Sequence, residues 1–95
     1  MDDPIQACRF RIRGRVQGVG FRHATREQAR AIGVRGWVRN ESDGSVVAVA
    51  AGTADQLETF RRWCTEGPAR ARVTDVDVAA AAEPDSLPEP FEVRG

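Results

Sequence analysis

Three glycines fall within seven positions of one short segment, residues 12–22, whose sequence is IRGRVQGVGFR. Gly14, Gly18 and Gly20 separate an alternating run from a run of helix formers, and Arg22 follows them. Glycines allow the positive φ angles that turn successive N–H groups toward one point, and the N–H groups at a helix start lack intrahelical partners. The segment therefore predicts an anion-binding loop, with the planar Arg22 guanidinium matching two phosphate oxygens.

Known phosphate-binding motifs do not match this segment. Gly14 and Gly18 are too close together for a Walker loop, and no Lys-Ser/Thr pair follows them. Counted from Gly18 and Gly20, the third glycine of the dinucleotide fingerprint would fall on His23. The glycines alone are equally compatible with a tight strand-to-helix turn that binds nothing.

The residues on either side of the loop predict the elements that hold it. Residues 8–13, CRFRIR, alternate between apolar side chains and the arginines Arg9, Arg11 and Arg13, which predicts a strand with one buried face. Residues 21–32 repeat apolar or small side chains at spacings of three and four, which predicts a helix that ends at Gly33.

A hairpin follows the first helix. Residues 36–40, GWVRN, and 45–51, SVVAVAA, are short and rich in β-forming side chains. The Asp43-Gly44 pair between them is typical of a hairpin turn. We therefore expect two antiparallel strands, with Asn40 at the end of the first.

The rest of the chain predicts a second helix and two further strands. Thr53 and Gln56 have the spacing of a capping box, and an apolar stripe follows them as far as Gly67. The later segments are a strand over 71–78, a proline-rich loop over 79–90 and a short strand over 91–94.

This order of elements predicts an α+β fold of the ferredoxin-like βαββαβ type. Both helices would cover one face of an antiparallel sheet that has a short extra C-terminal strand. The other face would be open, so that Asp75 and Asp77 could pair with arginines of the first strand. We expect a single domain over residues 1–95, with a flexible N-terminus over 1–6.

Composition excludes several classes of function. Fourteen basic residues balance fourteen acidic ones, so no global field favours nucleic acid. Cys8 and Cys64 are too few for a disulfide scaffold and lack metal-ligand spacing, so we expect both to be reduced core residues. The N-terminus does not resemble a signal peptide, and no apolar run approaches a membrane span. We expect a cytoplasmic monomer with no nucleic-acid or membrane partner.

Two segments together resemble the signatures of the acylphosphatase family. The first is IRGRVQGVGFR, and the second is GWVRNESDGSVVAVAAG over residues 36–52. The resemblance implies hydrolysis of acyl phosphates with no metal or organic cofactor, Arg22 binding phosphate and Asn40 positioning the water. It also implies phosphate-binding amides at Gly14, Arg15, Val16, Gln17, Gly18 and Val19. Ala24 departs from the family pattern, in which many relatives carry an aromatic residue.

The chemistry of the segments agrees with that implication. Neither signature contains a cysteine nucleophile or paired carboxylates. Such a site can still hydrolyse a mixed anhydride, because the carboxylate leaves without a proton, its conjugate acid having a pKa of about 4 to 5. The remaining tasks are to hold the phosphoryl oxygens and to aim a water, and the Asn40 amide can do the second.

Other interpretations of single residues stay open from the sequence. Asn40 could be an ordinary turn residue. His23 should point about 100° away from Arg22 around the helix, at the surface or on a positive rim. Trp37 and Trp63 are more typical of packing than of a substrate platform.

Two alternative functions belong to different classes. The same kind of domain occurs in larger hydrogenase-maturation proteins, where it meets carbamoyl phosphate, so a non-catalytic binding module is one alternative. RNA binding is the other, but the central strands lack exposed aromatic side chains. For the enzyme, we expect a small acyl phosphate as substrate and inorganic phosphate as product and competitive inhibitor.

Overall fold

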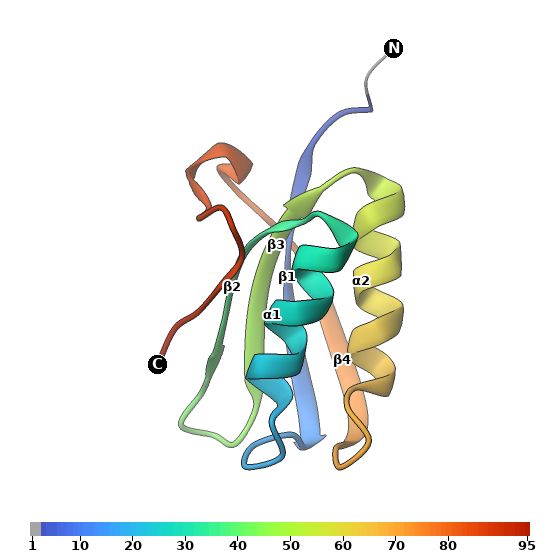
Figure 1. The fold of residues 1–95 in the computed structure, drawn as a ribbon, viewed down its shortest axis with the longest axis vertical. Helices are drawn as coiled ribbons and strands as arrows, with labels where there is room; N and C mark the ends of the chain where they lie inside the picture. The colour runs from blue at the N-terminus through green and yellow to red at the C-terminus, as the bar shows by residue number, and fades with distance from the viewer. Residues whose placement is uncertain (1–2) are drawn as a thin grey trace.

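Each periodic segment of the sequence forms a helix or strand in the computed structural model, which describes residues 3–95 (Figure 1). The elements are, in chain order, β1 Gln6–Arg15, α1 Phe21–Ile32, β2 Arg35–Asn40, β3 Val46–Gly52, α2 Ala54–Glu66, β4 Arg72–Ala81, the 3-10 helix η1 Pro84–Ser86 and β5 Glu92–Val93.

The five strands form one mixed sheet in the order β4, β1, β3, β2, β5. The β1–β3, β1–β4 and β2–β3 pairs are antiparallel, and the short β5 runs parallel to β2. Both helices cover the same face of the sheet, and they run in opposite directions (Figure 1). The predicted ferredoxin-like fold is confirmed, including the extra strand.

The core lies between the helices and the sheet and contains four phenylalanines. Phe10 of β1 meets Phe60 of α2 edge to face at 5.1 Å, and Phe60 also packs against Phe91 at 5.9 Å. Phe21, the first residue of α1, packs against Trp63 at 5.5 Å, so the start of α1 is anchored to α2. These aromatic contacts hold the helix start that borders the glycine loop in place.

Two strands extend beyond the expected bounds, and in each case the cause is a partner strand. β1 begins at Gln6, opposite Gly52, and β4 continues through its alanines to Ala81, opposite Ala7. Alanines have low strand propensity, so only the neighbouring strand makes this extension favourable. Of the predicted flexible segment 1–6, residues 1 and 2 lie outside the described part of the chain.

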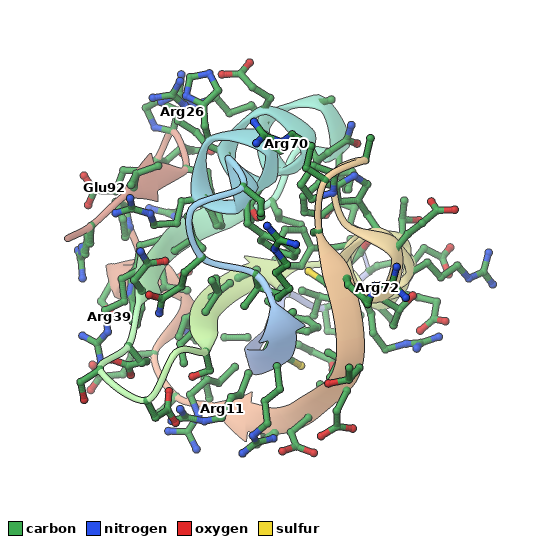
Figure 2. All side chains as sticks on the ribbon, turned by 90° about the horizontal axis from the view of Figure 1, so that it is seen from below. Arg11, Arg26, Arg39, Arg70, Arg72 and Glu92 are labelled. Atoms are coloured by element: carbon green, nitrogen blue, oxygen red, sulfur yellow. The ribbon has the colours of Figure 1, made fainter. Side chains whose placement is uncertain are left out.

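The sheet face away from the helices carries the expected ion pairs but is not fully open. Arg13 contacts both Asp75 and Asp77 across the β1–β4 pair, and Arg11 lies on this side of the sheet (Figure 2). Leu87, from the loop after η1, packs on one end of the face among small apolar side chains. The proline-rich loop therefore covers part of a surface that the sequence predicted to be open.

No helix within residues 3–95 combines the length and apolar character needed to span a membrane.

Candidate active site

A cavity of about 310 Å³ opens at the end of the sheet where the β1–α1 loop meets the β2–β3 turn. Both connections lie at the lower end of the molecule in Figure 1. The lining residues come from the loop, the first turns of α1 and the ends of two strands: Val16, Gly18, Gly20, Phe21, Arg22, His23, Arg26, Asn40 and Val93. Three separate stretches of the chain thus build one site.

The glycine loop is held by its two valines. Val16 and Val19 are buried in the main core, at 1% and 8% exposure. Between and after them, Gly18 and Gly20 have φ angles of 74° and 80°, which other residues adopt at a cost. A Cβ atom at either glycine would meet nothing within 4 Å, so packing does not require glycine there. The two glycines are needed for the shape of the backbone, and they leave open space beside it.

The start of α1 is not capped by the protein. Gly20 occupies the N-cap position in the left-handed conformation, no side chain accepts a hydrogen bond there, and the first turn has no acidic residue. The first amide N–H groups of a helix have no intrahelical acceptor, and the helix dipole adds partial positive charge. This helix start, open to the cavity, is therefore suited to binding an anion.

Gln17 connects the loop to the hairpin turn. Its Nε2 donates to the backbone oxygens of Glu41 at 2.8 Å and of Ser45 at 2.9 Å. Asp43 Oδ1 in turn accepts from the Ser45 hydroxyl at 2.6 Å and from its N–H at 2.9 Å, and these bonds hold the pKa of the Asp43 carboxyl below its usual range. The side chain of Gln17 therefore fixes the distance between loop and hairpin, a role that the sequence did not reveal.

Asn40, the last residue of β2, lines the cavity and carries a polar atom in an unusual position. Its Oδ1 is buried and is the one buried side-chain nitrogen or oxygen in residues 3–95 without a hydrogen-bond partner. A buried acceptor without a partner costs about 1 to 3 kcal/mol. Because Asn40 lines the cavity, a molecule bound there can supply the missing donor once the amide turns toward it.

Arg22 follows the first residue of α1 and also lines the cavity. Its Nη1 donates to the backbone oxygen of Gly95. This contact brings the segment after β5 to the guanidinium. Arg22 and Asn40, predicted as partners from distant parts of the sequence, are thus brought together around one space.

The structure does not bring every predicted phosphate-binding residue to this cavity. Gly14 and Arg15 belong to β1 and pair with Val73 and Arg72 of β4. A Cβ atom at Gly14 would lie 2.1 Å from the Arg72 oxygen, so this glycine is required by the sheet. Val16 and Gly18 do line the cavity, whereas the side chains of Gln17 and Val19 point to the hairpin and the core.

Of the two positions that the sequence left open for His23, the surface or a positive rim, the structure agrees with the rim. His23 lines the same cavity as Arg22, because the cavity opens at the end of α1, where neighbouring positions around the axis both border it. Arg26 and Val93 also line it and were missed. The spacing of four residues between Arg22 and Arg26 could have revealed the arginine, since such pairs share a helix face. Nothing in the sequence around Val93 indicates a site.

The lining is basic. It contains two arginines and a histidine and no carboxylate. In Figure 2, Arg26 and Glu92 lie on one side of the molecule and Arg72 on the other. Glu92 is paired with Arg94 at 3.2 Å and does not line the cavity. Across residues 3–95, no three His, Cys, Asp or Glu side chains are placed to hold a metal ion together.

Comparison with known proteins shows close relatives along almost the whole chain. The family model described as Acylphosphatase matches residues 8–93. An acylphosphatase of Rhizobium etli is 45% identical over the full length of both chains. An acylphosphatase of Salinibacter ruber is 55% identical over 84 residues, which cover 88% of this chain and 87% of that one. The crystal structure of acylphosphatase from Bacillus subtilis superposes with a TM-score of 0.89 at 30% identity, covering 97% of this chain and all of the other.

Proposed function

Because this chain belongs to the acylphosphatase family, a family of enzymes that hydrolyse acyl phosphates, we propose that it does so without a metal ion, using Arg22 and Asn40 as catalytic residues. The products are a carboxylate and inorganic phosphate. The observation that carries the residue assignment is the buried, unpaired Asn40 Oδ1, which shares a cavity with Arg22 and the uncapped start of α1.

The phosphoryl group binds at the loop end of the cavity. Its oxygens accept hydrogen bonds from backbone amides between Val16 and Gly20 and from the first turn of α1, where the helix dipole favours negative charge. The Arg22 guanidinium contacts two of the same oxygens as a planar fork. For this the guanidinium gives up its contact with the Gly95 oxygen.

The attacking water is held by Asn40. Once the amide turns toward the cavity, its Oδ1 atom accepts a hydrogen bond from the water, which gives a partner to an acceptor that is otherwise buried without one. The water oxygen is then aimed at phosphorus from the side opposite the acyl oxygen. Positioning of this kind lowers the barrier without removing a proton beforehand.

The bond changes need no further acid or base. The water oxygen forms a bond to phosphorus as the bond between phosphorus and the acyl oxygen breaks, and the electron pair leaves on the carboxylate. A carboxylate is stable without a proton, because its conjugate acid has a pKa of about 4 to 5. The water's proton ends on an oxygen of the new phosphate. The Arg22 guanidinium and the amide N–H groups at the start of α1 stabilise the charge that moves during this step.

Hydrolysis of benzoyl phosphate in the presence of a chelator tests this proposal. We expect turnover that the chelator does not reduce, competitive inhibition by inorganic phosphate, and little hydrolysis of p-nitrophenyl phosphate, whose leaving group is a poorer one. Strong loss of activity with the chelator, or similar rates on the monoester, would contradict it. Phosphate binding without turnover of any acyl phosphate would favour a non-catalytic binding module instead.

A further inference from the structure

Arg26 is a charged residue of the cavity that the proposed mechanism does not use. It lies on α1 four residues after Arg22, so the two side chains share a helix face, and their Cα atoms are about 6 Å apart along the axis. Its side chain is 28% exposed. A second guanidinium therefore stands one helical turn beyond the one assigned to the phosphoryl group.

The contacts of Arg26 hold its guanidinium in place but leave one side of it available. Nη2 lies 3.0 Å from His23 Nδ1 and 3.1 Å from Glu27 Oε1, and Nε lies 3.2 Å from the same Glu27 oxygen. Within residues 3–95, Nη1 has no such partner. Glu27 is 59% exposed and does not line the cavity, so it weakens the positive charge there without cancelling it.

An apolar surface lies in the same cavity. Val93 of β5 is one of only three large apolar residues exposed within residues 3–95, and it borders the space together with the buried Val16 and Phe21. The hydrocarbon part of an acyl group could contact Val93 while the phosphoryl group stays at Arg22. A polar group at the far end of that hydrocarbon would then reach toward Arg26.

We infer that the enzyme prefers acyl phosphates whose acyl group carries a second anionic group, which Arg26 binds about one helical turn from the phosphoryl group. This inference rests on the proposed function, because it takes the phosphoryl position from Arg22. His23 acts as a positioning residue: its ring accepts a hydrogen bond from Arg26 and holds the guanidinium beside the cavity. Arg26 is thus a residue that determines specificity and takes no part in bond cleavage.

The test compares two substrates of the same size. 4-Carboxybenzoyl phosphate and 4-carbamoylbenzoyl phosphate share the reacting anhydride and differ in one remote charge. We expect the native protein to favour the carboxylate in kcat/KM by about two- to five-fold at low salt, the range for a partly exposed ion pair, with the ratio falling as salt is added. Arg26→Gln should bring the ratio to about one, and Arg26→Glu should reverse it.

The matched control is Arg62→Gln on α2, which removes the same charge from a side chain that is 74% exposed and remote from the cavity lining. It should keep the native ratio. A native ratio near one, or a ratio that Arg26→Gln leaves unchanged, would overturn the inference. An equal loss on both substrates in Arg26→Gln would also overturn it, because that is the result of a purely structural role.

Binding of the stable analogues 4-carboxybenzylphosphonate and 4-carbamoylbenzylphosphonate, measured by calorimetry, separates this inference from the proposed function. If no acyl phosphate is hydrolysed, the proposed function fails, and the inference is judged on the phosphonates alone. A two- to five-fold tighter binding of the carboxylate that Arg26→Gln removes would support it. Equal binding of the two compounds would overturn it.

Discussion

The two helices of this protein begin in opposite ways, although each is the next element in the chain after a central strand of the same sheet. At α2, Thr53 Oγ1 accepts from Gln56 N–H at 3.2 Å and Gln56 Oε1 accepts from Thr53 N–H at 2.9 Å. Gln56 also donates to the oxygen of Ile32, in the last turn of α1. At α1, Gly20 provides no cap, and no acidic residue follows it. Side chains therefore cap the backbone N–H groups at the start of α2, whereas the start of α1 has no side-chain cap.

The glycines at the two helix starts differ in the same way. A Cβ atom at Gly52, just before α2, would lie 2.7 Å from Gln56 Oε1 and 2.9 Å from a Val34 methyl group, so close packing requires glycine there. A Cβ atom at Gly18 or Gly20 would meet nothing within 4 Å, so these positions require glycine only because their φ angles are positive. Glycine in a strand-to-helix connection therefore indicates a binding site only where the space beside it is empty and the helix start lacks a cap.

The largest effect on activity is expected when the cation beside the uncapped start of α1 is removed. Arg22→Ala should lower turnover of benzoyl phosphate by at least ~10² to 10³, the range for losing one preorganised donor, and should weaken inhibition by phosphate. Arg22→Lys should not restore activity, because the planar fork is lost. Steady-state kinetics on folded protein, checked by circular dichroism, give the answer. A lysine variant with near-native activity would show that Arg22 acts only as a point charge or lies outside the site.

Replacing Asn40 separates positioning of the water from binding of phosphate. Asn40→Ala should lower kcat by about 10², while the inhibition constant of phosphate stays nearly unchanged, because the interaction is made mainly in the transition state. If Asn40 only shapes the turn, the variant should instead melt at a lower temperature and keep its activity per folded molecule. Turnover, phosphate inhibition and melting temperature measured on one preparation distinguish the two outcomes.

The first turn of α2 contains a negative charge, and that of α1 does not. Adding a negative charge at the start of α1 should weaken the binding of anions there. Gly20→Asp adds a carboxylate at a position where a Cβ atom would meet nothing within 4 Å. We expect phosphate inhibition to weaken by about ten-fold, since a like charge opposes the ligand at the helix start. Gly20→Asn is the matched control, because asparagine tolerates positive φ and adds no charge. Equal phosphate affinity in the two variants would place the anion elsewhere.

The smallest effect on activity is expected at the capped helix. Thr53→Ala removes the capping box and should lower the free energy of unfolding by about 1 kcal/mol, or the melting temperature by about 4 to 8 °C, with kcat and KM unchanged. Thr59→Ala, the same substitution at an exposed position on α2, should change stability by less than about 0.5 kcal/mol. A loss of activity in Thr53→Ala that exceeds its unfolded fraction would mean that the two helix starts are coupled.

The sequence was sufficient where structure depends on near neighbours. The period-two run after Cys8, the hairpin signal at Asp43-Gly44 and the Thr53–Gln56 spacing each predicted an element that the structure contains. Helix α1 has the predicted bounds, and Gly33 ends it in the left-handed conformation. Propensity, capping and turn geometry involve residues within about four positions, so one sequence holds the needed information.

The candidate site was predictable only in part. Arg22 and Asn40 came from the two segments that resemble family signatures, and the structure places both at one cavity, while their catalytic roles stay predictions. The assignment of Gly14 to the phosphate loop stays a prediction, while the structure adds that this glycine pairs with β4, where a Cβ atom would lie 2.1 Å from the Arg72 oxygen. Val93 joined the cavity lining unpredicted, because β5 pairs with β2 next to Asn40.

The sequence by itself determined the elements, their order and the open helix start, since these follow from the residues along one stretch of chain. The tertiary structure alone decided which groups share a space with Arg22. Strand pairing and helix packing bring together residues far apart in the chain, and local propensity does not encode those distances. The same packing left Asn40 Oδ1 buried without a partner, and only a folded structure can show that an acceptor has been enclosed without its donor.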